Sequence, residues 1–275
     1  MFGYAQSAIP SWKTGFCPPV HWKNRHSSGG PEISIAGLSF SGFIRMPVSD
    51  QDQIAASITQ GTYTGSLDGV KAEAEERLRR EWQKRGYFKA EVSTDADVLS
   101  SNPAIERIAL NAHLEEGPRY HLKHITFTNN KVVPNTKALR SLFPIKDGDI
   151  FNREVVEKGL ENLRRAYGEM GYINFTSVPD TAVHEDSRTI SLDVDMDEGK
   201  VFYISSIEII GADIEVLNDL ALTPGQIYNV GLVELFLRKY LPEADVNDPD
   251  IQRRLLDELQ GTVALTFDFR SCPTN

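Results

Sequence analysis

The chain has 275 residues, of which 40% are hydrophobic and 25% are charged, so it is long enough to form the cores of two or three domains. Its net charge of −10 argues against nucleic acid as the main partner, because phosphate contacts need clustered Lys and Arg. The sequence has no apolar run long enough for a membrane-spanning helix, and it has no clear signal peptide.

The two ends of the chain carry weaker signals. Residues 1–30 are rich in Pro, Gly and Ser, and this composition predicts a poorly ordered lead-in. The two cysteines, Cys17 and Cys272, lie near opposite ends. They fit either a disulfide in an oxidising compartment or two unpaired thiols, and the sequence leaves both possibilities open.

The segment after the lead-in predicts a strand, two helices and two further strands. The expected elements are a strand around Leu38 and Phe40, helices at 51–59 and 69–85, and strands at 87–92 and 107–114. Residues 95–103 predict an exposed loop between the last two strands.

The same order follows a second time with clearer periodicity. The expected elements are a strand at 121–128, helices at 136–142 and 153–169, and strands at 172–178 and 190–196. The longer helix has an apolar stripe at helical spacing, formed by Val155, Val156, Leu160, Leu163 and Tyr167.

The third segment begins in the same way and then departs. A strand at 201–210 and a helix through 232–237 match the earlier units, but residues 242–250 stand where the next strand is expected. Residues 250–260 predict a further helix, and alternating apolar residues at 263–269 predict a closing strand. We therefore expect a third unit that is altered in its middle.

Two short motifs recur, the first at a spacing of 85 residues and the second at a spacing of 82. A Gly-Tyr pair follows the longer helix, and an acidic-glycine turn follows the last strand. The motif residues are Gly86, Tyr87, Glu116 and Gly117 in the first unit, and Gly171, Tyr172, Glu198 and Gly199 in the second. Glycine accepts the positive φ that ends a helix, and tyrosine can pack on the sheet, so we interpret these motifs as structural.

This pattern resembles the POTRA (polypeptide-transport-associated) domain family, which has the same element order, the Gly-Tyr pair and the Glu-Gly turn between modules. The resemblance covers residues 31–275. It implies an α+β fold of tandem β-α-α-β-β modules, each a three-stranded mixed sheet covered by two helices. The expected units are 31–117, 118–199 and a divergent third unit at 200–275.

The resemblance also implies a role. POTRA arrays precede a membrane β-barrel in the family that assembles or translocates outer-membrane proteins, although no succession of barrel-type strands follows the third unit here. We expect a periplasmic array, associated with the outer membrane of a Gram-negative-type bacterium. Its expected partners are unfolded outer-membrane proteins, a membrane β-barrel or an accessory protein, with no small-molecule substrate. Two alternatives stay open: a structural adaptor of a membrane-associated complex, or the amino-terminal fragment of a longer barrel protein.

In family members the strand after Gly-Tyr lies at the edge of the sheet, where free backbone groups can pair with an added strand. The candidate client-binding residues are Tyr87, Phe88, Lys89, Ala90, Glu91 and Val92 in the first unit, and Tyr172, Ile173, Asn174, Phe175, Thr176, Ser177 and Val178 in the second. The alternative is an edge that stays solvated, blocked by Lys89, Glu91 or Asn174.

The sequence contains no complete motif for catalysis or metal binding. Asp193, Asp195 and Asp197 look like the start of a calcium loop, but Glu198 stands at the position that must be glycine. We therefore expect neither an enzyme nor a site for a metal or cofactor.

Overall fold

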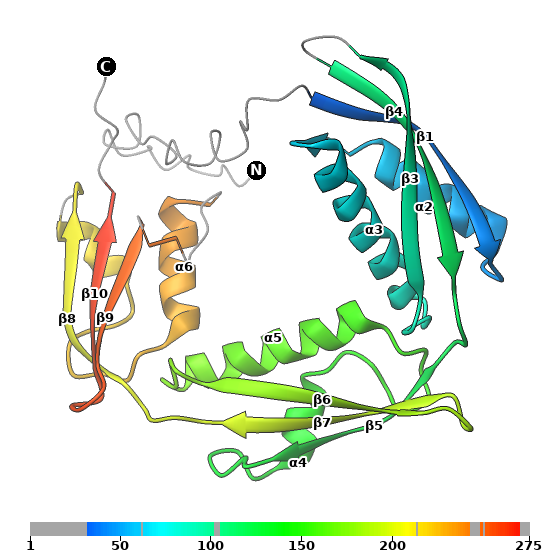
Figure 1. The fold of residues 1–275 in the computed structure, drawn as a ribbon. Coiled ribbons are helices and arrows are strands. Elements are labelled where there is room, and N and C mark those ends of the chain that lie inside the picture. Colours follow the sequence, from blue (N-terminus) through cyan, green and yellow to red (C-terminus); the bar gives the residue numbers. More distant parts are fainter. Residues whose placement is uncertain are drawn as a thin grey trace, which may run out of the picture. The chain divides into compact units, whose positions relative to one another are not determined.

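The computed structural model describes residues 32–269 except 62, 102–104, 213, 243–247 and 250. The described part of the chain builds three β-sheets and the helices that pack on them (Figure 1). The predicted lead-in at 1–30 and both cysteines, Cys17 and Cys272, lie outside the described residues. None of the helices in the described part is long and apolar enough to cross a membrane.

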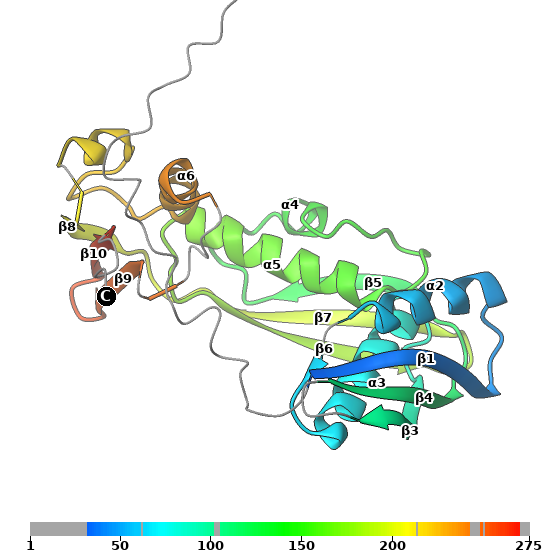
Figure 2. The same ribbon diagram turned by 90° about the horizontal axis from the view of Figure 1, so that it is seen from above.

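The first sheet has four strands. Its elements are β1 (Glu32–Phe43), α2 (Val48–Thr59), β2 (Tyr63–Thr64), α3 (Leu67–Lys84), β3 (Glu91–Ser101) and β4 (Ile105–Glu115). Figures 1 and 2 show β4 between β1 and β3, and the full order is β2-β1-β4-β3. β4 is parallel to β1 and antiparallel to β3. The predicted mixed sheet is confirmed, and the two-residue strand β2 is an addition to it.

Helix α3 forms because its sequence supplies a cap, a buried stripe and surface ion pairs. The side chain of Ser66 accepts a hydrogen bond from the N–H of Gly69 at the first turn. Its buried stripe is Val70, Ala74, Leu78 and Trp82, spaced four residues apart. These residues share one hydrophobic core with α2 and the inner face of the sheet.

The second sheet repeats the expected order. Its elements are β5 (His121–Thr128), α4 (Thr136–Ser141), α5 (Arg153–Glu169), β6 (Thr176–His184) and β7 (Thr189–Asp197). The strand order is β5-β7-β6, with β5 parallel to β7. The bounds of α5 are those predicted from its apolar stripe, and α4 ends one residue earlier than predicted.

The third sheet is more regular than its sequence indicates. Its elements are β8 (Tyr203–Ile210), the 3-10 helix η2 (Ile214–Asp219), α6 (Val230–Tyr240), β9 (Gln252–Asp257) and β10 (Thr262–Asp268). The order is β8-β10-β9, so the third sheet has the same arrangement as the second. We refer to the segments that build the three sheets as the first, second and third repeats.

The predicted helix at 250–260 is wrong. The Arg, Leu and Glu residues of this segment are good helix formers, which explains the prediction. Residues 252–257 instead pair antiparallel with β10, in a hairpin that places Leu256 opposite the buried Val263. Pairing with β10 therefore outweighs local helix propensity. The third repeat has an edge strand, β9, which the sequence did not predict. The predicted loop is also wrong over residues 95–101, because β3 pairs with β4 as far as Ser101; residues 102–103 of that prediction lie outside the described residues.

The chain divides into two compact units, and the division does not follow the three sheets. Among the described residues, one unit contains 32–163 and 177–196, and the other contains 164–176 and 197–269. The connection between the first and second repeats therefore lies inside one unit. The connection between the second and third repeats lies inside the other.

Tyr228 gives a stability prediction, because its hydroxyl is buried in the third core without a hydrogen-bond partner among the described residues. Its counterpart in the second repeat is Phe151: each residue donates its backbone N–H, at 2.9 Å, to the carbonyl of the residue that precedes the first strand of its repeat. Replacing Tyr228 with Phe is expected to raise the free energy of unfolding by about 1 kcal/mol, since an unpaired buried hydroxyl is removed. Chemical denaturation measures this change. The reverse substitution, Phe151→Tyr, is the matched control and should be destabilising; a loss of stability in Tyr228→Phe would contradict the assignment.

Candidate functional site

The edge strands expected in the first two repeats lie at the edges of their sheets, and β9, which the sequence did not predict, holds the same place in the third. β3 is the outer strand of the first sheet, β6 of the second and β9 of the third. Each is therefore paired on one side within its own sheet.

The strands begin later than predicted. β3 starts at Glu91 and β6 at Thr176, so Glu91, Val92, Thr176, Ser177 and Val178 lie in strands as expected. The strand assignment is wrong for the residues before them, which form a turn in each repeat: Tyr87, Phe88, Lys89 and Ala90, and Tyr172, Ile173, Asn174 and Phe175. In each turn the fourth residue donates its N–H to the carbonyl of the tyrosine, at 3.1 and 3.2 Å.

These turns contact the next repeat. The carbonyl of Gly86 accepts the N–H of Tyr120 at 2.9 Å, and that of Gly171 accepts the N–H of Phe202 at 3.0 Å. The ring of Phe88 lies edge-on to Phe151, with centroids 5.4 Å apart. The turn residues thus form the junctions between repeats, whereas the sequence predicted them to be parts of edge strands.

In the second and third repeats, the hairpin between the last two strands reaches the junction with the preceding repeat. Glu185, in the β6–β7 hairpin, forms an ion pair with Lys89 and accepts a hydrogen bond from the hydroxyl of Tyr120 at 2.7 Å. Burial and this hydrogen bond raise the pKa of Tyr120 to about 12. At the second junction, Asn174 donates to Glu258 of the β9–β10 hairpin. The two junctions therefore bring together equivalent segments, the turn after the Gly-Tyr pair and the hairpin of the next repeat, although the contacting side chains differ.

The glycine of each Gly-Tyr pair is required by its conformation and by its neighbour. Gly86 and Gly171 both have a φ of +92°. A methyl group on Gly86 would lie 2.6 Å from Cγ2 of Ile150, and one on Gly171 would lie 2.5 Å from Cγ2 of Ile227. The isoleucine comes from the next repeat in each case. The motif therefore permits close approach between repeats as well as ending a helix.

The glutamate of each acidic-glycine turn is buried and hydrogen-bonded. Glu116 accepts from the N–H groups of Arg45 and Met46, at 2.7 and 3.0 Å, and from the indole N–H of Trp82 at 2.9 Å. Glu198 accepts from the hydroxyl of Tyr167 at 2.7 Å. Trp82 and Tyr167 hold the same position, four residues before the glycine of the Gly-Tyr pair. The turn is thus held to the long helix of its own repeat by a buried carboxylate.

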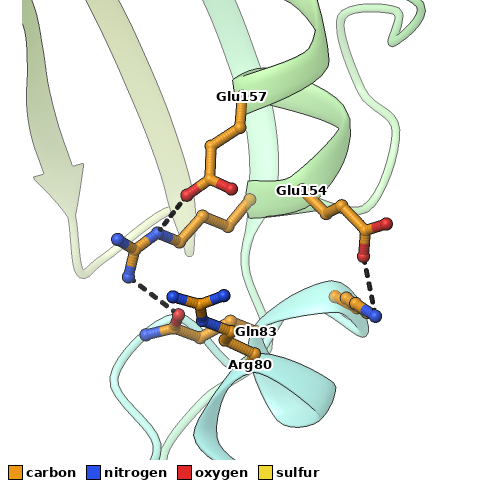
Figure 3. Close-up of a pocket in the computed structure, with 6 residues that line it drawn as sticks. Arg80, Gln83, Glu154 and Glu157 are labelled. Atoms are coloured by element: carbon orange, nitrogen blue, oxygen red, sulfur yellow. Dashed lines mark hydrogen bonds and ion pairs between the residues drawn. The ribbon is translucent and has the colours of Figure 1, made fainter. Parts of the chain in front are cut away.

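A cavity of about 330 Å³ lies where the end of α3 meets the start of α5 (Figure 3). Every charged residue of its lining is ion-paired: Lys84 contacts Glu154 at 2.7 Å, and Arg153 bonds Glu157 and Gln83 at 3.0 Å each. The remaining cation, Arg80, pairs with Glu76 of its own helix at 3.0 Å. The hydrogen bonds to Glu154 and Glu81 raise the pKa of Lys84 and keep it charged. Because these charges are paired, the lining offers no unpaired charge to a ligand. The ion pairs instead connect α3 of the first repeat to α5 of the second. Among the described residues no group of His, Cys, Asp or Glu could hold a metal ion.

The outward-facing backbone groups of β3 can be identified from one hydrogen bond. Thr94 donates its N–H to Oε1 of Glu75 on α3, at 2.7 Å, and therefore does not donate it to β4. Bonded and non-bonded pairs alternate along an antiparallel ladder, so Val92 and Ala96 also direct their backbone groups away from β4. The N–H of Asp97, by the same alternation, faces β4.

Comparisons with known proteins agree with this architecture. Residues 120–199 match the POTRA family model, described as a surface antigen variable number repeat. The crystal structure of POTRA domains 3–5 of Haemophilus influenzae BamA covers 88% of this chain and 96% of its own, with a TM-score of 0.66 at 16% identity. The chain therefore has the fold of a tandem array of POTRA domains, and its residues 120–199 match the POTRA family itself.

Two curated relatives extend the likeness to sequence. The outer membrane protein assembly factor BamA of Buchnera aphidicola is 24% identical over 204 residues. A putative outer membrane protein assembly factor of Treponema pallidum is 26% identical over 218 residues. The matches cover 72% and 73% of this chain but only 32% and 25% of the relatives, so the chain spans about a third or less of their length.

Proposed function

We propose that this POTRA array acts in the periplasm, at the outer membrane of a Gram-negative-type bacterium, where it binds outer-membrane protein clients or assembly partners by β-strand addition. Its domains would be 31–117, 118–199 and 200–275. The two assembly factors that it resembles support the role. The observation that carries the mechanism is the same in all three sheets: the next-to-last strand of the repeat, β3, β6 or β9, lies at an edge of its sheet. An edge strand can pair with an added strand.

The junction contacts reduce the set of candidate client-binding residues. The turns that follow Gly86 and Gly171 are engaged with the next repeat, so we assign client pairing to the strands that follow them. Backbone pairing suits a binder of many clients, because main-chain hydrogen bonds supply affinity and ask little of the client's sequence. On this proposal the array needs no cofactor and no turnover.

Closing the edges of β3 and β6 with proline tests the proposal for two of the three edge strands. Ala96→Pro removes an outward N–H from β3. In β6, Pro179 already stands within the strand, which is tolerated where the nitrogen faces away from the neighbouring strand, so Thr181 faces outward as well. The Ala96→Pro/Thr181→Pro variant is expected to bind a fluorescent peptide from a membrane β-barrel strand about 10-fold more weakly in an anisotropy titration, through the loss of outward hydrogen bonds.

The matched control is Asp97→Pro, in which the lost N–H faces β4. This substitution should lower the melting temperature of the array by removing a hydrogen bond of the sheet itself. Undiminished peptide binding by a folded Ala96→Pro/Thr181→Pro variant would contradict strand addition at β3 and β6.

A further inference from the structure

In each of the three edge strands, one equivalent residue has no backbone N–H available to an added strand, and we call this the closed position. In β3 the closed position is Thr94. Its outward N–H is held by Oε1 of Glu75 at 2.7 Å, and its hydroxyl donates to the same oxygen at 3.1 Å. Glu75 reaches this point from α3, while Lys71, one turn earlier on the same helix, lies 3.8 Å from Asp95. An added strand cannot pair with Thr94 unless Glu75 withdraws.

The same position is closed in the second repeat by a different residue. Thr94 follows the glycine of its Gly-Tyr pair by the same number of residues as Pro179 follows Gly171. Proline has no N–H, so β6 lacks the donor that Glu75 occupies in β3. The residue at the position of Glu75 in α5 is Leu160, which has no acceptor to offer, and none is needed there.

The third repeat closes the position with its own backbone. Gln252 pairs with Phe267 in the way that Thr94 pairs with Ala112. The N–H of Asp268 donates to the carbonyl of Ile251, so the alternation of the ladder turns Gln252 outward. Its N–H donates to the carbonyl of Asp248 at 2.9 Å and is therefore engaged.

Beyond the closed position the edges are open. In β3 the next outward residues are Ala96 and Val98, before a register shift between Val98 and Ser100. Val98 and Leu99 are 52% and 59% exposed, so two apolar side chains lie in the open part of this edge strand and can contact an added strand. In β9 the corresponding outward residues are Arg254 and Leu256, with Leu255 between them 76% exposed.

We propose that strand addition is confined to the hairpin-side half of each edge strand, and that Glu75 sets its boundary in the first repeat. The inference rests on the proposed function. The occupant is an extended polypeptide segment with alternating apolar and polar residues, whose apolar side chains contact Val98 and Leu99. Each repeat then provides a short ladder, so a client held firmly must pair with more than one repeat.

Amide hydrogen exchange on the full chain tests the boundary without a ligand. In the unmodified protein the Thr94 amide should exchange at least about 10-fold more slowly than the Ala96 amide, because only the first has an acceptor. Glu75→Ala should abolish that difference, and Glu75→Gln, which keeps an acceptor oxygen, should restore part of it. Glu73→Ala is the matched control on α3, since Glu73 pairs with Arg77 and leaves Thr94 untouched. Equal exchange of Thr94 and Ala96 in the unmodified protein would overturn the boundary.

A second arm adds a ten-residue peptide of alternating Val and Thr. Slower exchange at Ala96 and Val98 but not at Thr94, with Thr94 joining them in Glu75→Ala, is the expected result. New protection at Thr94 in the unmodified protein would overturn the boundary. Absence of any peptide-dependent protection at β3, β6 or β9 would overturn strand addition itself, while the ligand-free arm still judges the closed position.

Discussion

Replacing Glu116 with alanine is expected to lower the free energy of unfolding by about 3 kcal/mol or more, because three donors, two of them buried, lose their acceptor. Glu116 is 1% exposed, and its carboxylate accepts from two backbone N–H groups and from Trp82. Urea denaturation, followed by far-ultraviolet circular dichroism, measures the change. The same substitution should also loosen the connection to the second repeat, since Gly117 follows directly.

The neighbouring Glu115 provides the control. Its side chain is exposed and lies 3.5 Å from His113, so Glu115→Ala should change the free energy of unfolding by less than about 0.5 kcal/mol. Trp82→Phe, which removes one of the three donors and leaves the carboxylate in place, should fall between the two. Equal stability of Glu116→Ala and Glu115→Ala would refute the structural role assigned to the buried carboxylate.

Gly171→Ala is expected to destabilise the junction between the second and third repeats by about 2–4 kcal/mol. The first part of the cost is the positive φ of +92°, which disfavours any residue with a Cβ atom. The second part is the contact of that Cβ with Ile227, at 2.5 Å. Thermal denaturation of the full chain measures the sum.

Gly225→Ala separates the two parts. Gly225 has a φ of +90°, but a methyl group there would meet nothing within 4 Å, so only the conformational cost remains. The difference between the two variants should be at least about 1 kcal/mol, and Ile227→Ala should recover part of it in the Gly171→Ala background. Identical losses in Gly171→Ala and Gly225→Ala would show that the approach of the next repeat does not matter.

The sequence predicted the order of elements well where the apolar pattern is regular. The stripe of α5, from Val155 to Tyr167, defined that helix, and the alternation at 190–196 defined β7. It failed where pairing decides the structure: the segment containing Arg253 and Leu256 has helix-forming composition, yet it forms β9 because β10 lies beside it. The bounds of β3 could not be found either, since they depend on the register with β4.

The candidate site was predicted in part. The edge positions of β3 and β6 followed from the order of elements, but the roles of the turn residues did not. Phe88 and Lys89 contact residues of the next repeat that lie far along the chain, and local sequence carries no signal for that. The closing of Thr94 by Glu75 was equally invisible, although Pro179 marks the corresponding position in the second repeat.

The central claim is that an extended client becomes an added strand on β3. Intermolecular nuclear Overhauser effects between the deuterated, amide-protonated array and an unlabelled barrel-strand peptide test it directly. We expect contacts from the peptide backbone to the amides of Ala96 and Val98, and none to those of Asp95 and Asp97, which face β4. Contacts confined to helix surfaces, or contacts with peptide side chains alone, would contradict strand addition.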